Sequence, residues 1–274
     1  MDLLFWAPVI AGGLIAGASS GLLGVFIVGM RIPFLGICIA HAALAGAVFG
    51  SLAGLQGTYL LIPALAGAAV TALALGLWNS HHFQMDDNVV MGVLFSASMG
   101  LAFLGIGLFG TMGRSDNDVR SLLWGSLNYC HWNDVGLMLG AAVALAGFIT
   151  LFFKEMRAIM FSREMAAATG IHATLVWTLF LILTAVVLTV NFQTVGGLMI
   201  YSLVANPAAA AFQLTKGCRR TIGVAVILGA LSGVGGFLIS AFTDLPTGAV
   251  IVLFSSALVP LAAISASILR RFRL

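Results

Sequence analysis

The chain has 274 residues, of which 61% are hydrophobic and only 8% are charged, and its formal net charge is +3. Ordinary soluble domains carry about 25% charged residues. This composition therefore excludes a soluble globular domain and indicates an integral membrane protein.

Apolar segments long enough to cross a bilayer, which takes about 20 residues, follow one another along the whole chain. They predict an all-α fold, a polytopic membrane helix bundle with about eight or nine transmembrane helices in a single domain over 1–274. The segment 195–212 is short and contains Pro207, and Pro260 breaks the last segment, so either is a candidate for a re-entrant or interrupted helix. The predicted spans are 5–30, 32–55, 58–78, 88–113, 135–153, 173–190, 195–212, 221–243 and 247–269.

The basic residues follow the positive-inside rule for this arrangement. With nine spans and an outer N-terminus, ten of the 12 Lys and Arg residues fall in inner loops, and only Arg114 and Arg120 fall outside. The asymmetry predicts a cytoplasmic C-terminus. Because the basic residues are confined to short loops, the positive charge does not indicate nucleic-acid binding.

Glycines recur every four residues in three of the predicted spans. This spacing places small residues on one face of a helix and lets neighbouring backbones approach closely. We therefore expect close helix packing at these glycines, which are Gly13, Gly17 and Gly21, then Gly46, Gly50 and Gly54, then Gly229 and Gly233.

Three polar segments interrupt the apolar pattern. The segment 114–134 is predicted outside, with an interfacial or re-entrant helix at its centre. The segment 154–172 is predicted inside, as a short cytosolic helix that ends at Gly170. His81 and His82 share a short loop with two aspartates, where they form either a weak metal site or a solvated turn.

No signature of catalysis occurs in the sequence. It contains no HExxH, Walker A or GxSxG pattern and no Cys/His cluster at metal-finger spacing. The predicted spans contain no Asp or Glu, whereas proton-driven carriers place carboxylates inside the membrane as a relay. We therefore predict that the chain is a conduit, with no catalytic residues, and not an enzyme or a proton-driven transporter.

One histidine stands in the middle of an apolar run. His41 lies within "ICIAHAALAGAVFG", residues 37–50. Polar side chains inside a membrane are expensive and are usually functional. His41 is therefore a candidate for contact with a substrate or metal, and the alternative is a neutral histidine hydrogen-bonded to a neighbouring helix.

Four stretches of the chain resemble the permease subunits of zinc, manganese and iron ABC importers. The stretch "RIPFLGICIAHAALAGAVFG" (31–50) is similar to the second-helix signature of that family. "FSREMAAATGI" (161–171) corresponds to its coupling helix. "TVGGLMIYSLVANPAAAAFQL" (194–214) and "SAFTDLPTGAVIVL" (240–253) are similar to two later family segments. The resemblance runs almost end to end, in order and in register.

The resemblance implies a homodimeric ABC importer permease in the bacterial cytoplasmic (inner) membrane, surrounded by lipid. It implies two cytosolic ABC ATPase subunits on separate chains, which bind the ATP, and an extracytoplasmic substrate-binding protein. This chain would then carry no cofactor of its own, and the transported metal ion would be its substrate. No nucleic acid is implied.

The resemblance also implies a metal gate at His41. In relatives this histidine and an aspartate four residues earlier face one ion, because positions i and i+4 share a helix face. Here the earlier position is Ile37, which cannot bind a metal, while Cys38 could offer a thiolate. The predicted substrate pathway comprises His41, Cys38, Ile37, Tyr201, Ser202 and Asn206, with His41 as the metal ligand.

The cytosolic segment is predicted to couple the chain to its ATPase. Docking into an ATPase groove requires an exposed apolar side chain with flanking charges, and Phe161 or Met165 would supply the former. The alternative is a helix lying on the membrane surface. The predicted coupling residues are Phe161, Ser162, Arg163, Glu164, Met165 and Gly170.

The family resemblance favours a divalent transition metal, zinc, manganese or iron, as the cargo. The absence of the acidic residue at position 37 makes a chelated metal, such as an iron–siderophore complex, a second candidate. Two other classes remain open at this point: a membrane assembly subunit that transports nothing, and a secondary carrier driven by an ion gradient.

Overall fold

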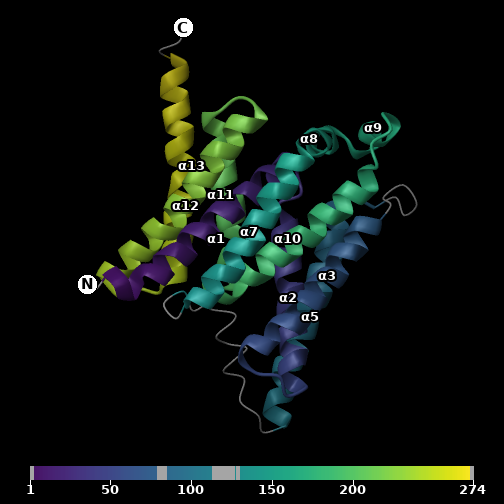
Figure 1. Ribbon diagram of the computed structural model, residues 1–274, viewed down its shortest axis with the longest axis vertical. Coiled ribbons are helices and arrows are strands. Elements are labelled where there is room, and N and C mark those ends of the chain that lie inside the picture. The colour runs from purple at the N-terminus through teal and green to yellow at the C-terminus, as the bar shows by residue number, and fades with distance from the viewer. Residues whose placement is uncertain (1–2, 79–84, 113–126, 128–129, 272–274) are drawn as a thin grey trace.

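The computed structural model describes residues 3–78, 85–112, 127 and 130–271. The secondary structure of these residues is helical throughout (Figure 1). The elements are α1 (Leu3–Gly29), α2 (Phe34–Leu52), η1 (Gly57–Leu60), α3 (Leu61–Leu77), α5 (Asp87–Thr111), α7 (Trp132–Leu151), α8 (Phe153–Phe161), α9 (Arg163–Ala168), α10 (Ala173–Val195), α11 (Gly197–Leu214), α12 (Cys218–Thr243) and α13 (Thr247–Arg271).

Eight helices in the described ranges are long and apolar enough to cross a membrane: α1, α2, α3 with η1, α5, α7, α10, α12 and α13. The ninth long helix, α11, has 18 residues and contains Pro207. The predicted membrane bundle of eight or nine helices is confirmed. Helices dominate because a membrane offers no water to the backbone, so each span must satisfy its own N–H and C=O groups.

The prolines do not interrupt the helices as expected. α13 continues through Pro260 and α11 continues through Pro207, so the expected break in the last span is wrong. Neighbouring helices and side chains make proline tolerable inside membrane helices. The chain breaks instead at Gly196, whose φ of +96° separates α10 from α11; glycine adopts this left-handed conformation without a steric penalty.

The helices form two groups that α1 and α10 connect (Figure 1). In the first group, α12 packs along α1, and α11 and α13 pack beside them. In the second group, α2 lies between α3 and α5, and α3 also packs against α10. The short helices α8 and α9 lie beyond one end of α10. The largest apolar core, which includes Phe26, Ile39 and Phe180, lies where α1, α2 and α10 meet.

Most of the predicted glycine positions are close helix contacts. Gly13 and Gly17 of α1 face α12, and Gly46 and Gly50 of α2 face Pro63 of α3. Gly54 differs, because no neighbouring atom lies within 4 Å of where its Cβ would be. It has a φ of +96° and ends α2 as a left-handed C-cap.

Candidate functional site

His41 lies on α2, with its ring turned toward α5. Its side chain is only 5% exposed. The ring of Phe95 on α5 meets the imidazole edge-on, with the two centroids 4.8 Å apart, and Phe95 also packs against Phe34 at 5.4 Å. Aromatic contacts between two membrane helices thus fix where the imidazole lies.

A backbone carbonyl orients the imidazole of His41. Its Nδ1 lies 2.9 Å from the carbonyl oxygen of Ile37, one turn earlier on the same helix. Because a carbonyl oxygen only accepts hydrogen bonds, Nδ1 carries the proton in this arrangement, and a neutral ring keeps its lone pair on Nε2. Histidines that bind metals usually donate their second N–H in this way. The expected alternative placed the partner on a neighbouring helix, whereas this partner is on α2 itself.

The two neighbours of His41 in the predicted pathway have different surroundings. The side chain of Ile37 is half-buried, and its main chain holds the imidazole. Cys38 is completely buried within the main apolar core. In the described part of the chain, no group of three or more His, Cys, Asp or Glu side chains comes together. His41 is therefore not part of a complete metal cage within the described residues of one chain.

The three other predicted pathway residues lie on α11. Tyr201 is half-buried and Ser202 is buried. The amide nitrogen of Asn206 donates hydrogen bonds to Ser255 Oγ at 3.1 Å and to Ser256 Oγ at 3.0 Å. Both serines belong to α13, so the Asn206 side chain joins α11 to α13 immediately before Pro207.

The two sets of predicted pathway residues lie on neighbouring helices. α2 and α11 are in contact, and Gly36 lies at one of their contacts. A Cβ at Gly36 would lie 3.9 Å from Cγ1 of Val204. Gly36 precedes Cys38 and His41, and Val204 lies between Ser202 and Asn206. The fold thus brings together helices that are about 160 residues apart in sequence.

A buried polar contact in the bundle was not predicted from the sequence. Asn191 of α10 is only 1% exposed, and its amide nitrogen donates to Ser19 Oγ at 3.0 Å and to Ser20 Oγ at 3.4 Å, both on α1. Polar side chains hydrogen-bond between helices because hydrocarbon offers them no other partner. The sequence signal was an asparagine directly after the predicted span 173–190, too near its end to be recognised as intramembrane.

The predicted coupling segment forms two short helices. α8 and α9 meet at Ser162, which has an extended backbone and whose Oγ accepts a hydrogen bond from Met165 N at 3.3 Å. Gly170 has a φ of +87° and ends α9 with bonds from Gly170 N to Ala167 O and from Ile171 N to Ala166 O. The helix end at Gly170 agrees with the prediction, and the break at Ser162 was not predicted.

Two large apolar side chains protrude from this segment. Phe161 is 82% exposed and Met165 is 59% exposed, and Glu164 between them is also exposed. This arrangement has the exposed apolar side chains and the neighbouring charge that the coupling prediction requires. Docking to an ATPase stays a prediction.

Arg163 anchors α9 to the membrane helices. Its Nη2 donates to the carbonyl oxygen of Gly76, near the end of α3, at 3.2 Å, and to Thr174 Oγ1, in the first turn of α10, at 3.5 Å. Burial lowers the pKa of Arg163 below its ordinary value, and the nearby charge of Asp87 opposes that shift. A positive charge at the carboxyl end of a helix is stabilised by the helix dipole. Arg163 thus points toward the membrane helices.

Two of the predicted features lie outside the described residues. They are the pair His81 and His82, and the centre of the segment 114–134 apart from Leu127, which is buried.

Comparison with known proteins places the chain in a family. A profile of the family described as "ABC 3 transport family" matches residues 2–266. The manganese transport system membrane protein MntC of Halalkalibacterium halodurans is 29% identical over 253 residues, which is 92% of this chain and 84% of that protein. The high-affinity zinc uptake system membrane protein ZnuB of Haemophilus influenzae is 27% identical over 94% of this chain and 95% of its own length.

Two solved structures share the fold. A structure of PsaBC from Streptococcus pneumoniae in complex with Fab matches 94% of this chain and 90% of its own, with a TM-score of 0.80 and 22% identity. A metal-chelate type ABC transporter in an inward-facing conformation matches 96% of this chain and 88% of its own, with a TM-score of 0.71 and 15% identity. The resemblance seen in the four sequence stretches is thereby confirmed. The chain is a membrane subunit of a transporter, not an enzyme, and it belongs to the ABC-3 transport family.

Proposed function

We propose that this chain is the transmembrane permease of an ATP-driven importer for a divalent transition metal: zinc, manganese or iron. The observation that carries the proposal is the hydrogen bond that orients the buried imidazole of His41. Its Nδ1 is bonded to the Ile37 carbonyl oxygen at 2.9 Å, so a neutral ring keeps on Nε2 the lone pair that would bind a metal. Imidazole nitrogen suits all three metals. The relatives named for manganese and zinc transport support the same cargo class.

The proposed assembly is a homodimer of this chain with two cytosolic ATPase subunits and an extracytoplasmic binding protein. Two copies would bring two His41 side chains to one path, which compensates for the lack of a metal-binding cluster in the described part of one chain. The single membrane domain would carry the coupling segment 154–172 on its cytosolic side, where Phe161 protrudes. Alternating access would follow when ATP binding draws the two coupling segments together.

The location proposed is the bacterial inner membrane, with a cytoplasmic C-terminus. The support is the distribution of basic residues, ten of 12 of which fall on one side in the nine-span arrangement. Reporter fusions after residue 274 and within the segment 114–134 test this orientation. A C-terminal reporter that is active only outside the cytoplasm would contradict it.

A chelated metal is the second candidate cargo. The observation that favours it is Ile37, which stands one turn before His41 and offers no ligand. A complex that arrives with its metal already coordinated needs fewer protein ligands than a bare ion does. Under this alternative His41 would contact the chelate through a hydrogen bond.

Metal accumulation in cells, measured by mass spectrometry, tests the proposal. The permease is expressed with its ATPase and binding protein as wild type, as His41→Ala and as Phe49→Ala, a control at an exposed position of α2. We expect His41→Ala to reduce uptake of free Zn²⁺, Mn²⁺ or Fe²⁺ at least tenfold and Phe49→Ala to leave uptake unchanged.

The other outcomes distinguish the alternatives. Wild-type cells that gain iron only when a siderophore is supplied would support the chelate and contradict the bare ion. Wild-type cells that gain neither, with no stimulation of the ATPase, would indicate a subunit that transports nothing. Ile37→Asp, which restores a carboxylate one turn before His41, should lower the free-ion concentration needed for uptake if His41 ligates the metal.

A further inference from the structure

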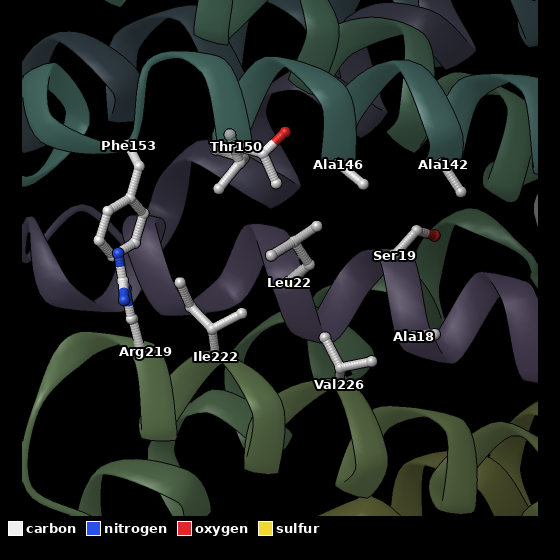
Figure 2. A pocket seen from close by; sticks show the side chains of 11 residues that line it. Ala18, Ser19, Leu22, Ala142, Ala146, Thr150, Phe153, Arg219, Ile222 and Val226 are labelled. Carbon is white, nitrogen blue, oxygen red and sulfur yellow. The ribbon is translucent and has the colours of Figure 1, made fainter.

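A hollow on the side of the bundle is built from three membrane helices and one cytosolic helix. α1, α7 and α12 form its walls, and Phe153 at the start of α8 closes one end (Figure 2). Its volume is about 610 Å³. The walls are small or aliphatic, with Ala18, Ala142, Ala146, Ile222 and Val226 among the lining residues.

The dimensions of this groove match one leaflet of a bilayer. Its lining on α7 runs from Ala142 to Thr150, which spans about 12 Å at 1.5 Å per residue. The hydrocarbon core of a bilayer is about 30 Å thick, so one leaflet contributes about half of that. Because all three walls are membrane spans, the groove lies at the depth of lipid acyl chains.

Positive charge gathers at the closed end of the groove. Arg219, in the first turn of α12, lines the groove and places its Cζ 5.3 Å from the centroid of the Phe153 ring. Arg157 of α8 places its Cζ 5.8 Å from the same centroid. In the part of the chain that the structure describes, neither guanidinium group has an ion-pair contact with an Asp or Glu side chain. Two cations thus share one aromatic ring, and no Asp or Glu among the described residues forms an ion pair with either of them.

We propose that this groove binds an anionic glycerophospholipid, with an acyl chain between α1, α7 and α12 and the phosphate on Arg219 and Arg157. The aliphatic walls suit the acyl chain. The two guanidinium groups, which have no ion pair among the described residues, suit the phosphate, which arginine binds through two parallel N–H donors. The phosphate end lies beside α8, on the side where the basic loops gather and where anionic lipids attract them. The bound lipid would brace α8 against α12. This proposal does not depend on which cargo the chain transports.

Native mass spectrometry of the purified full chain in mixed micelles tests the site with phosphatidylglycerol as the probe. We expect the wild type to retain phosphatidylglycerol in preference to phosphatidylcholine of the same chain length. Arg219→Gln combined with Arg157→Gln should weaken retention at least tenfold. The matched control is Arg220→Gln, because Arg220 is the exposed neighbour of Arg219 and has no contact with the Phe153 ring among the described contacts.

A second variant tests the groove itself. Ala146→Phe fills the groove with a large side chain and leaves both arginines in place. It should reduce the retention of phosphatidylglycerol. The effect of added inorganic phosphate on that retention should be the same as in the wild type. Equal retention of phosphatidylcholine, or an equal loss in Arg220→Gln, would overturn the proposal. If inorganic phosphate by itself displaces phosphatidylglycerol, the arginines bind a free anion. That result would overturn the proposal that a lipid occupies the groove.

Discussion

Gly17 of α1 and Gly229 of α12 face each other so closely that a methyl group on either would overlap the carbonyl oxygen of the other. A methyl group on Gly233 would overlap the carbonyl oxygen of Gly13, whereas one on Gly13 would lie 3.2 Å from the carbonyl oxygen of Gly233, and Gly21 faces the backbone at Ala225. The five glycines and Ala225 form a line of backbone contact between α1 and α12. Small residues at this spacing let van der Waals contact drive helix association in lipid, where the hydrophobic effect is absent between helices.

Gly17→Ala is expected to destabilise the bundle. The added methyl must push α1 and α12 apart, and overpacking of this kind costs about 1–3 kcal/mol. Thermal unfolding in detergent, followed by loss of monodisperse protein, measures the effect. Gly223→Ala is the matched control, because Gly223 lies on α12, the partner helix of α1, with no neighbouring atom within 4 Å of the new Cβ. An equal loss of stability in both variants would contradict the close contact.

Asn191→Leu is expected to loosen α10 from α1. The change removes the bonds to Ser19 and Ser20, and interhelical hydrogen bonds in membranes contribute about 0.6 kcal/mol on average and at most about 1.7 kcal/mol. We expect a loss of about 1 kcal/mol, measured as a shift in the unfolding midpoint. Asn133→Leu, at an exposed position of α7, should show no comparable shift. An unchanged midpoint for Asn191→Leu would mean that the contact contributes nothing.

Phe161→Ala is expected to weaken assembly with the ATPase while leaving the membrane domain intact. The side chain is 82% exposed, so its removal costs the isolated chain little packing, whereas a docking site would lose its central apolar contact. Co-purification of the ATPase with the tagged permease measures assembly. Leu151→Ala removes a side chain that is 76% exposed at the end of α7, and its co-purification should match that of the wild type. A full yield of ATPase with Phe161→Ala would place the docking contact elsewhere.

Arg163→Gln is expected to uncouple ATP hydrolysis from transport. Arg163 ties α9 to the ends of α3 and α10 through Gly76 and Thr174, so without it a movement of the coupling segment would reach the bundle less directly. In proteoliposomes with ATPase and binding protein, we expect fewer ions transported per ATP hydrolysed, by several-fold. Arg163→Lys keeps the charge and should recover part of the ratio.

The control for Arg163 is Lys154→Gln, a loss of positive charge at an exposed position of α8. Its ratio of transport to hydrolysis should remain that of the wild type. A parallel fall of both rates in Arg163→Gln, with the ratio unchanged, would indicate a loss of folded protein and would contradict a role in coupling.

The sequence alone determined the membrane class and the set of long helices. Apolar segments of span length favour helices, because a backbone in hydrocarbon must satisfy its own hydrogen bonds. The end of α9 at Gly170 could also be predicted, because a left-handed C-cap is a local property of glycine. The hydrogen bond from His41 to Ile37 is local too, since it joins residues four apart. The sequence did not predict it, because the imidazole side chain can adopt several rotamers.

Only the tertiary structure decided which surfaces meet. The spacing of Gly17 predicted a close contact but not its partner, which lies more than 200 residues later on α12. Asn191 meets Ser19 across 172 residues, and Arg163, which the sequence suggested as a flank of the docking surface, turns back to Gly76 across 87 residues. In lipid every apolar helix face is compatible with every other by hydrophobicity. Partners are therefore selected by shape and by a few polar contacts, which depend on the whole fold.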